Sequence, residues 1–205
     1  MAKATATLAS LINERLRPAA DTADVDRRIE ALFGEEWCVV FSDMEGFSRR
    51  AARTGIIPFL ALIHQMNRLC RPIIKHHAGF VLKRIADSYL ILFRDPRVAL
   101  GACVEMQLAL ARYNDQADER DHIHVGFGIG HGRVLKIGAE DVFGMEVNLA
   151  AKLGEDIAGA QEILLTRAAA LAIGTVPFAR LRRVRGSKLL GSRAGYYEAV
   201  YLSTR

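Results

Sequence analysis

The sequence predicts an α+β fold, in which a ferredoxin-like antiparallel or mixed sheet carries helices on one face. Short runs rich in β-branched and aromatic residues recur along the chain and indicate strands. Longer segments place apolar residues at helical spacing and indicate helices that pack on this sheet. The 205 residues suit one main domain, and because this topology hosts many functions, the function must be argued from motifs.

The N-terminal residues 1–36 are predicted to form a helical extension. Apolar residues such as Leu8 and Leu11 recur at helical spacing on both sides of residues 18–22. We therefore expect two helices joined by that segment, followed by the main domain over residues 37–205.

The main domain is predicted to begin with a strand at residues 37–42, which are dense in β-branched and aromatic side chains. Gly46 then opens a helical region that extends to His77. Pro58 marks a restart within it, because proline is favoured in the first turn of a helix.

Two further strands, at residues 79–83 and 88–93, are close enough in sequence to form a hairpin. Asp87 is expected at the turn of this hairpin. The remaining elements are a helix at 98–113, strands at 122–129 and 132–137, a helix at 145–157, and strands at 162–166, 178–184 and 196–202.

The composition is that of a folded soluble protein, with 51% hydrophobic and 25% charged residues. The N-terminal stretch has no persuasive cleavage site, so we expect a cytoplasmic location. No apolar run is long enough to cross a bilayer, so we expect no membrane insertion. The three cysteines are widely spaced among apolar neighbours, which favours plain core thiols over a disulfide framework. The net charge of +5 suits a nucleotide triphosphate, but nucleic acid and an anionic membrane surface suit it equally.

Three segments, in this order, carry the functional signal. Residues 41–48 read FSDMEGFS, residues 83–87 read KRIAD and are followed by Phe93, and residues 141–153 read DVFGMEVNLAAKL. Together they resemble the catalytic domain of class III adenylate and guanylate cyclases, over about residues 37–201. The resemblance implies conversion of ATP to 3′,5′-cyclic AMP and pyrophosphate, in signal transduction.

The resemblance implies a metal site formed by Asp43 and Asp87, with the Met44 carbonyl as a further ligand. Attack of the ribose 3′-oxygen on the α-phosphorus needs divalent cations that bridge phosphate oxygens and neutralise the leaving group. Two Mg²⁺ or Mn²⁺ ions per site are expected. The two aspartates would suffice, because magnesium keeps several waters and takes only one or two protein carboxylates. The alternative is that both residues are turn or capping aspartates.

The family selects adenine with a lysine and an aspartate at the positions of Lys83 and Asp141, where guanylate cyclases usually carry glutamate and cysteine. Lysine can donate to N1 of adenine and aspartate can accept from the N6 amine, which favours ATP over GTP. Phe47 is a further expected substrate-binding residue. The alternative for the pair is a salt-bridged surface lysine and a loop aspartate.

Asn148 and Lys152 are separated by four positions, so they share one face of the predicted helix. The resemblance implies that Asn148 orients the ribose and that Lys152 stands where the family has the arginine that stabilises charge on the α-phosphate. Lysine lacks the planar guanidinium fork, so the exchange is not conservative. Lys188, with Arg185 in reserve, resembles the basic residue that binds the polyphosphate.

A second departure is Ala86, where the family has glycine before the metal aspartate. If this turn needs positive φ, alanine strains it and displaces Asp87. A cyclase-like module that binds nucleotide or a partner protein without turnover therefore stays open as the alternative function.

In the family each site combines the metal aspartates of one protomer with the base-reading and helix residues of the other. A homodimer with two sites at the subunit interface follows, because this one chain carries both halves. The N-terminal helices either add to that interface or cap the sheet. An unidentified regulatory protein remains a possible partner, but RNA does not, because the central strands lack the interleaved aromatics of RNA-binding sheets.

Overall fold

The computed structural model of the chain describes residues 2–46, 55–184, 189 and 195–201. The helices are α1 (Ala2–Arg15), α2 (Thr22–Phe33), α4 (Ile56–His76), α5 (Pro96–Asn114), α6 (Met145–Ala151) and α7 (Arg167–Ile173), with a 3₁₀ turn η1 (Glu119–Asp121) and a π-helical turn η2 (Lys152–Ile157). The strands are β1 (Gly34–Met44), β2 (Phe80–Ile85), β3 (Ser88–Phe93), β4 (Val125–Ile137), β5 (Asp141–Phe143), β6 (Ile163–Leu165), β7 (Ala179–Arg183) and β8 (Tyr197–Tyr201).

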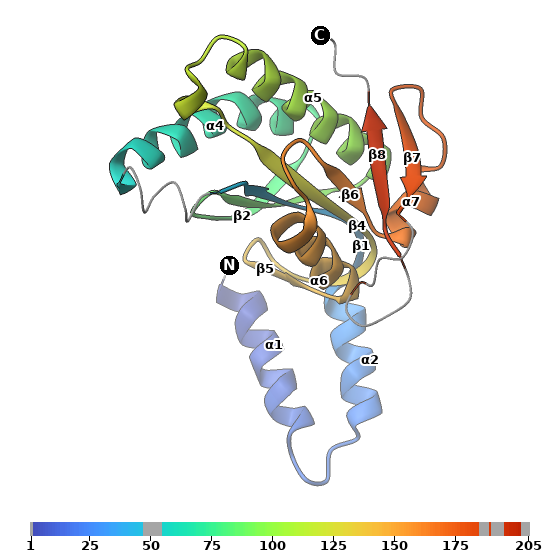
Figure 1. Cartoon of the computed structure of the whole chain (residues 1–205). Helices are drawn as coiled ribbons and strands as arrows, with labels where there is room; N and C mark the ends of the chain where they lie inside the picture. The colour runs from blue at the N-terminus through green and yellow to red at the C-terminus, as the bar shows by residue number, and fades with distance from the viewer. Residues whose placement is uncertain (1, 47–54, 185–188, 190–194, 202–205) are drawn as a thin grey trace.

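The strands form one mixed sheet in the order β2-β3-β1-β4-β6-β8-β7, with β5 paired to β4 (Figure 1). The β4–β6 pair is parallel, and the other pairs are antiparallel. The centre is the long β1–β4 ladder, which runs from Gly34 opposite Leu135 to Met44 opposite Val125. The predicted α+β fold class is confirmed.

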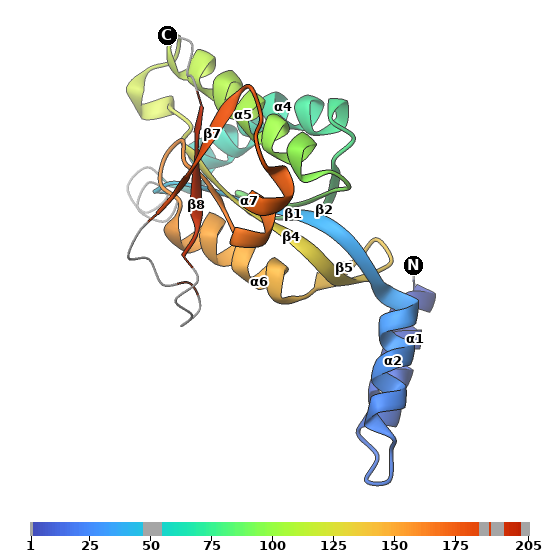
Figure 2. The same cartoon turned by 90° about the vertical axis from the view of Figure 1, so that its right-hand side faces the viewer.

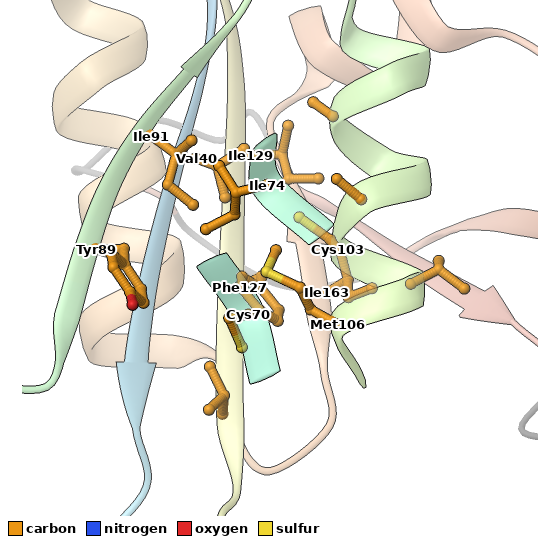
Figure 3. Close-up of a cluster of buried hydrophobic side chains, with 14 of the residues drawn as sticks. Val40, Cys70, Ile74, Tyr89, Ile91, Cys103, Met106, Phe127, Ile129 and Ile163 are labelled. Atoms are coloured by element: carbon orange, nitrogen blue, oxygen red, sulfur yellow. The ribbon is translucent and has the colours of Figure 1, made fainter. Parts of the chain in front are cut away.

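Helices α4 and α5 cover one face of this sheet (Figure 1). Alternate residues of the central strands, such as Val40, Phe127 and Ile129, point into this layer and meet Ile74 and Met106 of the two helices (Figure 3). All three cysteines are free and buried, as predicted for core thiols.

The opposite face carries α6 and η2, so the expectation that helices lie on one face only is wrong (Figure 2). The reason is the row of glycines in β4. A Cβ atom on Gly128 would lie 2.2 Å from the Ala150 carbonyl oxygen, and one on Gly130 would lie 2.4 Å from that of Glu146. Only a glycine-lined strand admits the α6 backbone this closely.

Other details also differ from the sequence prediction, and the short strand β5 was not predicted. The strands expected at 122–129 and 132–137 form the single strand β4, because Gly132 keeps its place in the ladder opposite Trp37. Helix α7 was not predicted, although Thr166 caps it by accepting a hydrogen bond from the Ala169 amide. The Gly46-initiated start of the long helical region lies outside the described residues, and the described helix begins at Ile56.

The N-terminal residues form the two predicted helices, which pack as a hairpin and project from the sheet (Figure 2). A small separate core, built on Leu11, Ile29 and Phe33, holds α1 and α2 against the end of β4. Strand β1 begins at Gly34, directly after α2, so the hairpin enters the sheet without a linker. Among the described residues no helix combines the length and apolar character that crossing a bilayer requires.

Candidate active site

Asp43 and Asp87 come together at one end of the β1–β3 pair. Asp43 is the penultimate residue of β1, and Asp87 lies in the tight turn between β2 and β3. The pairing of Ser42 with Tyr89 places this turn beside the end of β1. The Ser88 hydroxyl donates a 2.8 Å hydrogen bond to Oδ1 of Asp43, which fixes that carboxylate next to the turn.

The side chain of Asp87 is 5% exposed, and its Oδ2 atom is buried without a hydrogen-bond partner. Burial, together with the nearby Asp43, raises the pKa of Asp87 to about 6, and backbone hydrogen bonds oppose this rise. Burial also raises the pKa of Asp43, in part against the hydrogen bond from Ser88. An unpaired buried carboxylate is costly, so this pair is suited to a cation.

The donor set fits magnesium or manganese, which bind carboxylate oxygens and keep several waters. Within the described residues no three His, Cys, Asp or Glu side chains lie close enough to hold a metal ion by themselves. Two aspartates therefore suffice only for an ion that also takes ligands from water or a phosphate. Met44, whose side chain is 2% exposed, donates its backbone N–H toward Asp43 and Asp87.

The turn that carries Asp87 has a left-handed residue at Ala86, with φ of 51°. The turn therefore has the positive φ at which an alanine was expected to be strained. A non-glycine residue in this region costs on the order of 1 kcal/mol. The strain lies directly before the buried aspartate.

Lys83 and Asp141 also meet, although they come from β2 and β5, which are not neighbours in the sheet. Their Nζ and Oδ2 atoms are 2.7 Å apart, and each side chain is about one-third exposed (36% and 35%). The two atoms are within reach of a ligand that approaches from solvent. This contact by itself also agrees with the structural alternative of a surface salt bridge.

Asn148 and Lys152 belong to α6 and to the start of η2, as the predicted helix requires. Asn148 is exposed, and Lys152 Nζ lies 2.6 Å from Asp156 Oδ2. The backbone passes close to the sheet at Gly154, where a Cβ would lie 2.6 Å from the Phe41 carbonyl oxygen. Such single π-helical turns are frequent at functional sites.

Sequence reasoning missed the acidic residues that follow Lys152. Asp156 pairs with Lys152 and also raises the pKa of Asp43. The pKa of Glu155 is raised by partial burial, then by Asp43, Asp156 and Asp87. The sequence does contain a signal for these contacts, because Glu155 and Asp156 lie three and four positions after Lys152 in a predicted helix. Phe47, Arg185 and Lys188 lie outside the described residues.

The chain matches the family described as adenylate and guanylate cyclase catalytic domain over residues 31–188. It therefore belongs to that family. It is 28% identical over 134 residues to the serine/threonine-protein kinase pkn2 of Myxococcus xanthus, a match that covers 65% of this chain and 16% of that protein. The chain spans less than a fifth of the length of the curated relatives that it matches.

Solved structures with the same fold include cyclases of both specificities. The adenylate/guanylate cyclase/hydrolase from Silicibacter pomeroyi is 22% identical with a TM-score of 0.68, over 82% of this chain and 97% of that one. The adenylyl cyclase CyaB from P. aeruginosa is 21% identical with a TM-score of 0.66, over 82% and 94% of the two chains. At these identities the likeness establishes the fold, and the choice between ATP and GTP rests on the residues of the site.

Proposed function

We propose that this chain is an adenylate cyclase, which converts ATP to 3′,5′-cyclic AMP and pyrophosphate. The observation that carries the proposal is the contact between Lys83 Nζ and Asp141 Oδ2 at 2.7 Å. The donor and acceptor that adenine needs come from two distant strands and meet at a solvent-accessible position. A guanine base would present a carbonyl and an N1–H donor to the same two groups, which is the wrong pairing.

The metal site is assigned to Asp43 and Asp87, with the Met44 carbonyl as a third ligand. The support is the buried, unpartnered Oδ2 of Asp87 beside a second carboxylate. When bound, two Mg²⁺ or Mn²⁺ ions would bridge phosphate oxygens, lower the pKa of the 3′-hydroxyl and neutralise the leaving pyrophosphate. Ser88 holds Asp43 in its orientation by the hydrogen bond to Oδ1.

The remaining roles belong to α6, to the start of η2 and to three residues outside the described part of the chain. Asn148 orients the ribose, and Lys152 stabilises the negative charge that develops on the α-phosphate. Lys152 must first exchange Asp156 for the phosphate, because the two side chains are ion-paired in the absence of a ligand. Phe47, Lys188 and Arg185 are assigned to substrate binding on the resemblance alone.

The proposed active form is a homodimer with two sites at the subunit interface. One copy supplies Asp43 and Asp87 to each site, and the other supplies Lys83, Asp141 and Asn148. A two-fold axis then creates two identical sites from one kind of chain.

A second candidate is a cyclase-like module that binds nucleotide or a partner protein in signalling without turnover. Two observations favour it. Ala86 holds a strained φ of 51° directly before Asp87, and Lys152 is a lysine that is already neutralised by Asp156. Both features should weaken catalysis more than binding. Catalysis depends on the exact positions of the charged groups of Asp87 and Lys152, whereas binding tolerates small displacements.

The test is cyclic nucleotide production by the purified chain with ATP or GTP and with Mg²⁺ or Mn²⁺. The proposal predicts cyclic AMP as the product, its loss in Asp43→Ala, and a higher rate in Lys152→Arg. If neither the wild type nor Lys152→Arg turns over ATP, while ATP with metal raises the melting temperature, the chain is the binding module.

A further inference from the structure

A pocket with one acidic and one basic side chain lies between the first turns of α6 and α7. Its volume is about 290 Å³, and Leu189 and Gly195 complete its wall. Pockets for drug-sized ligands have volumes of roughly 300–1,000 Å³, so this one suits a smaller molecule. None of its lining residues is assigned above to ATP or to a metal ion, so the pocket is separate from the proposed active site.

The acidic group is Glu146 of α6, which is held in place from two sides. Its Oε2 atom accepts a 2.6 Å hydrogen bond from the Thr166 hydroxyl and a 3.1 Å hydrogen bond from the His131 backbone N–H. Thr166 is 1% exposed, so one of these donors belongs to the protein interior. No described residue donates a hydrogen bond to the other oxygen, Oε1. The carboxylate is therefore fixed in position with one oxygen available to a ligand.

The basic group is Arg167, the first residue of α7, and its side chain is exposed. It lines the same pocket as Glu146 but forms no ion pair with that residue or with any other described one. A guanidinium group can bind both oxygens of a carboxylate at once. The pocket thus offers one charge of each sign at separate positions. Glu146 would repel a simple anion such as phosphate, and Arg167 would repel a simple cation, so the arrangement favours a ligand that carries both charges.

The rest of the lining is largely apolar, and it includes Leu149, Leu171 and Leu189. Leu189 is 3% exposed, whereas Leu171 is 67% exposed. The apolar surface therefore extends from the interior to the solvent-facing side of α7. A ligand that covers Leu171 removes apolar surface from water, which favours a ligand with an apolar body.

We propose that this pocket binds a small α-amino acid with an apolar side chain. The ammonium group pairs with Oε1 of Glu146, the carboxylate pairs with Arg167, and the side chain packs against the leucines. Leu149 directly follows Asn148 on α6, so the ligand contacts the helix that carries the proposed ribose-binding residue. The binding itself does not depend on the proposed function, and it can be measured without any nucleotide.

The test is isothermal titration calorimetry of the full chain with L-leucine, L-methionine and L-phenylalanine. At least one of them is expected to bind with a dissociation constant of about 1 mM or lower. For L-leucine, two analogues each lack one charge: 3-methylbutylamine has no carboxylate, and 4-methylpentanoate has no ammonium group. Each analogue should bind at least about tenfold more weakly than L-leucine, because one charged group of the pocket is then left without a partner.

Two variants test the residues, and each should weaken binding of the amino acid at least about tenfold. Glu146→Gln removes the charge but keeps an oxygen that can accept the hydrogen bonds from Thr166 and His131. Arg167→Leu removes the guanidinium group at an exposed position, so its effect can be read even if Glu146→Gln does not fold. The matched control is Arg180→Leu, which makes the same change at an exposed arginine of β7 outside the pocket. Its affinity should equal that of the wild type.

Three results would overturn the inference. They are a wild type that binds none of the three amino acids at about 10 mM, analogues that bind as tightly as L-leucine, and equal losses of affinity in Arg167→Leu and Arg180→Leu. Cyclic AMP production is measured separately. A chain that cyclises ATP without binding these amino acids contradicts the pocket alone, and one that binds them without cyclising ATP contradicts the proposed function alone.

Discussion

Lys83 Nζ lies 2.7 Å from Asp141 Oδ2, and this contact joins the edge strand β2 to the short strand β5. Both side chains are about one-third exposed, and a surface ion pair contributes only about 0–1 kcal/mol to stability. In the proposed function, the pair supplies the one donor and the one acceptor that the edge of adenine requires.

Exchange of this pair should change the base that the chain accepts. We expect Lys83→Glu with Asp141→Cys to shift the ratio of kcat/KM for GTP over ATP by about 10²-fold or more, because guanine then meets groups that suit it and adenine no longer does. Lys75→Glu on α4 is the control, since it makes the same change of charge at an exposed lysine elsewhere. Equal shifts in both variants would show a general charge effect.

Relief of the strained turn should raise turnover. Ala86→Gly removes the penalty of a left-handed alanine, so we expect a gain in stability of up to about 1 kcal/mol and a higher kcat through better placement of Asp87. Ala78→Gly is the matched control, because Ala78 has φ of 53° at the end of α4. It should share the gain in stability measured by urea unfolding without any gain in kcat.

The buried Asp87 should make the metal-free protein less stable as the pH rises. The pKa of Asp87 is raised from 3.8 to about 6 in the folded state, so the folded protein holds this proton more tightly than the unfolded chain does. The folded state is therefore fully stable, with respect to this group, below about pH 4, and it loses this stability as the pH rises through 6. At pH 8 the cost is on the order of 3 kcal/mol. In EDTA, Asp87→Asn should therefore be more stable than the wild type at pH 8, with a smaller difference at pH 4.5.

The control for this titration is Asp118→Asn, at a side chain that is 72% exposed. Chemical denaturation should show no pH-dependent difference between this variant and the wild type. Mn²⁺ at pH 8 should stabilise the wild type and leave Asp87→Asn unchanged. Parallel pH curves for the wild type and Asp87→Asn would contradict the assignment of Asp87 as a buried, metal-seeking carboxylate.

The ion pair between Lys152 and Asp156 should compete with the phosphate of the substrate. Both side chains are about half exposed, so release of the pair costs at most about 1 kcal/mol. We expect Asp156→Asn to lower KM for ATP by up to about fivefold. The same substitution should have no such effect in a Lys152→Ala background, and an equal effect in both backgrounds would mean that Asp156 acts through Asp43 instead.

The sequence predicted the strands and long helices because their patterns are local. Phe127 and Ile129 alternate with glycines along β4, and Ile74 lies on an apolar helix face. These glycines were predicted to lie in a strand. The close packing of α6 that they permit was not predicted, because the approach of α6 to Gly128 is a tertiary contact. Helix α7 is short, and its apolar residues do not form a periodic series long enough to be recognised.

Within the candidate site the residue types were predictable and their partners were not. Asp43, Asp87, Lys83 and Asp141 stand in recognisable motifs, so their chemistry could be read from the chain. The burial of Asp87 depends on tertiary packing, and no sequence pattern indicates the π-helical turn that begins at Lys152.

The central claim is that ATP is cyclised at a site shared by two copies of this chain. The most direct measurement is cyclic AMP formation by an equimolar mixture of Asp43→Ala and Asn148→Ala, each inactive alone. Random exchange of subunits gives half heterodimers with one intact site of two, so the mixture should recover about a quarter of the wild-type activity. A mixture that remains inactive, although the two variants exchange subunits and the wild type is active, would contradict the shared site.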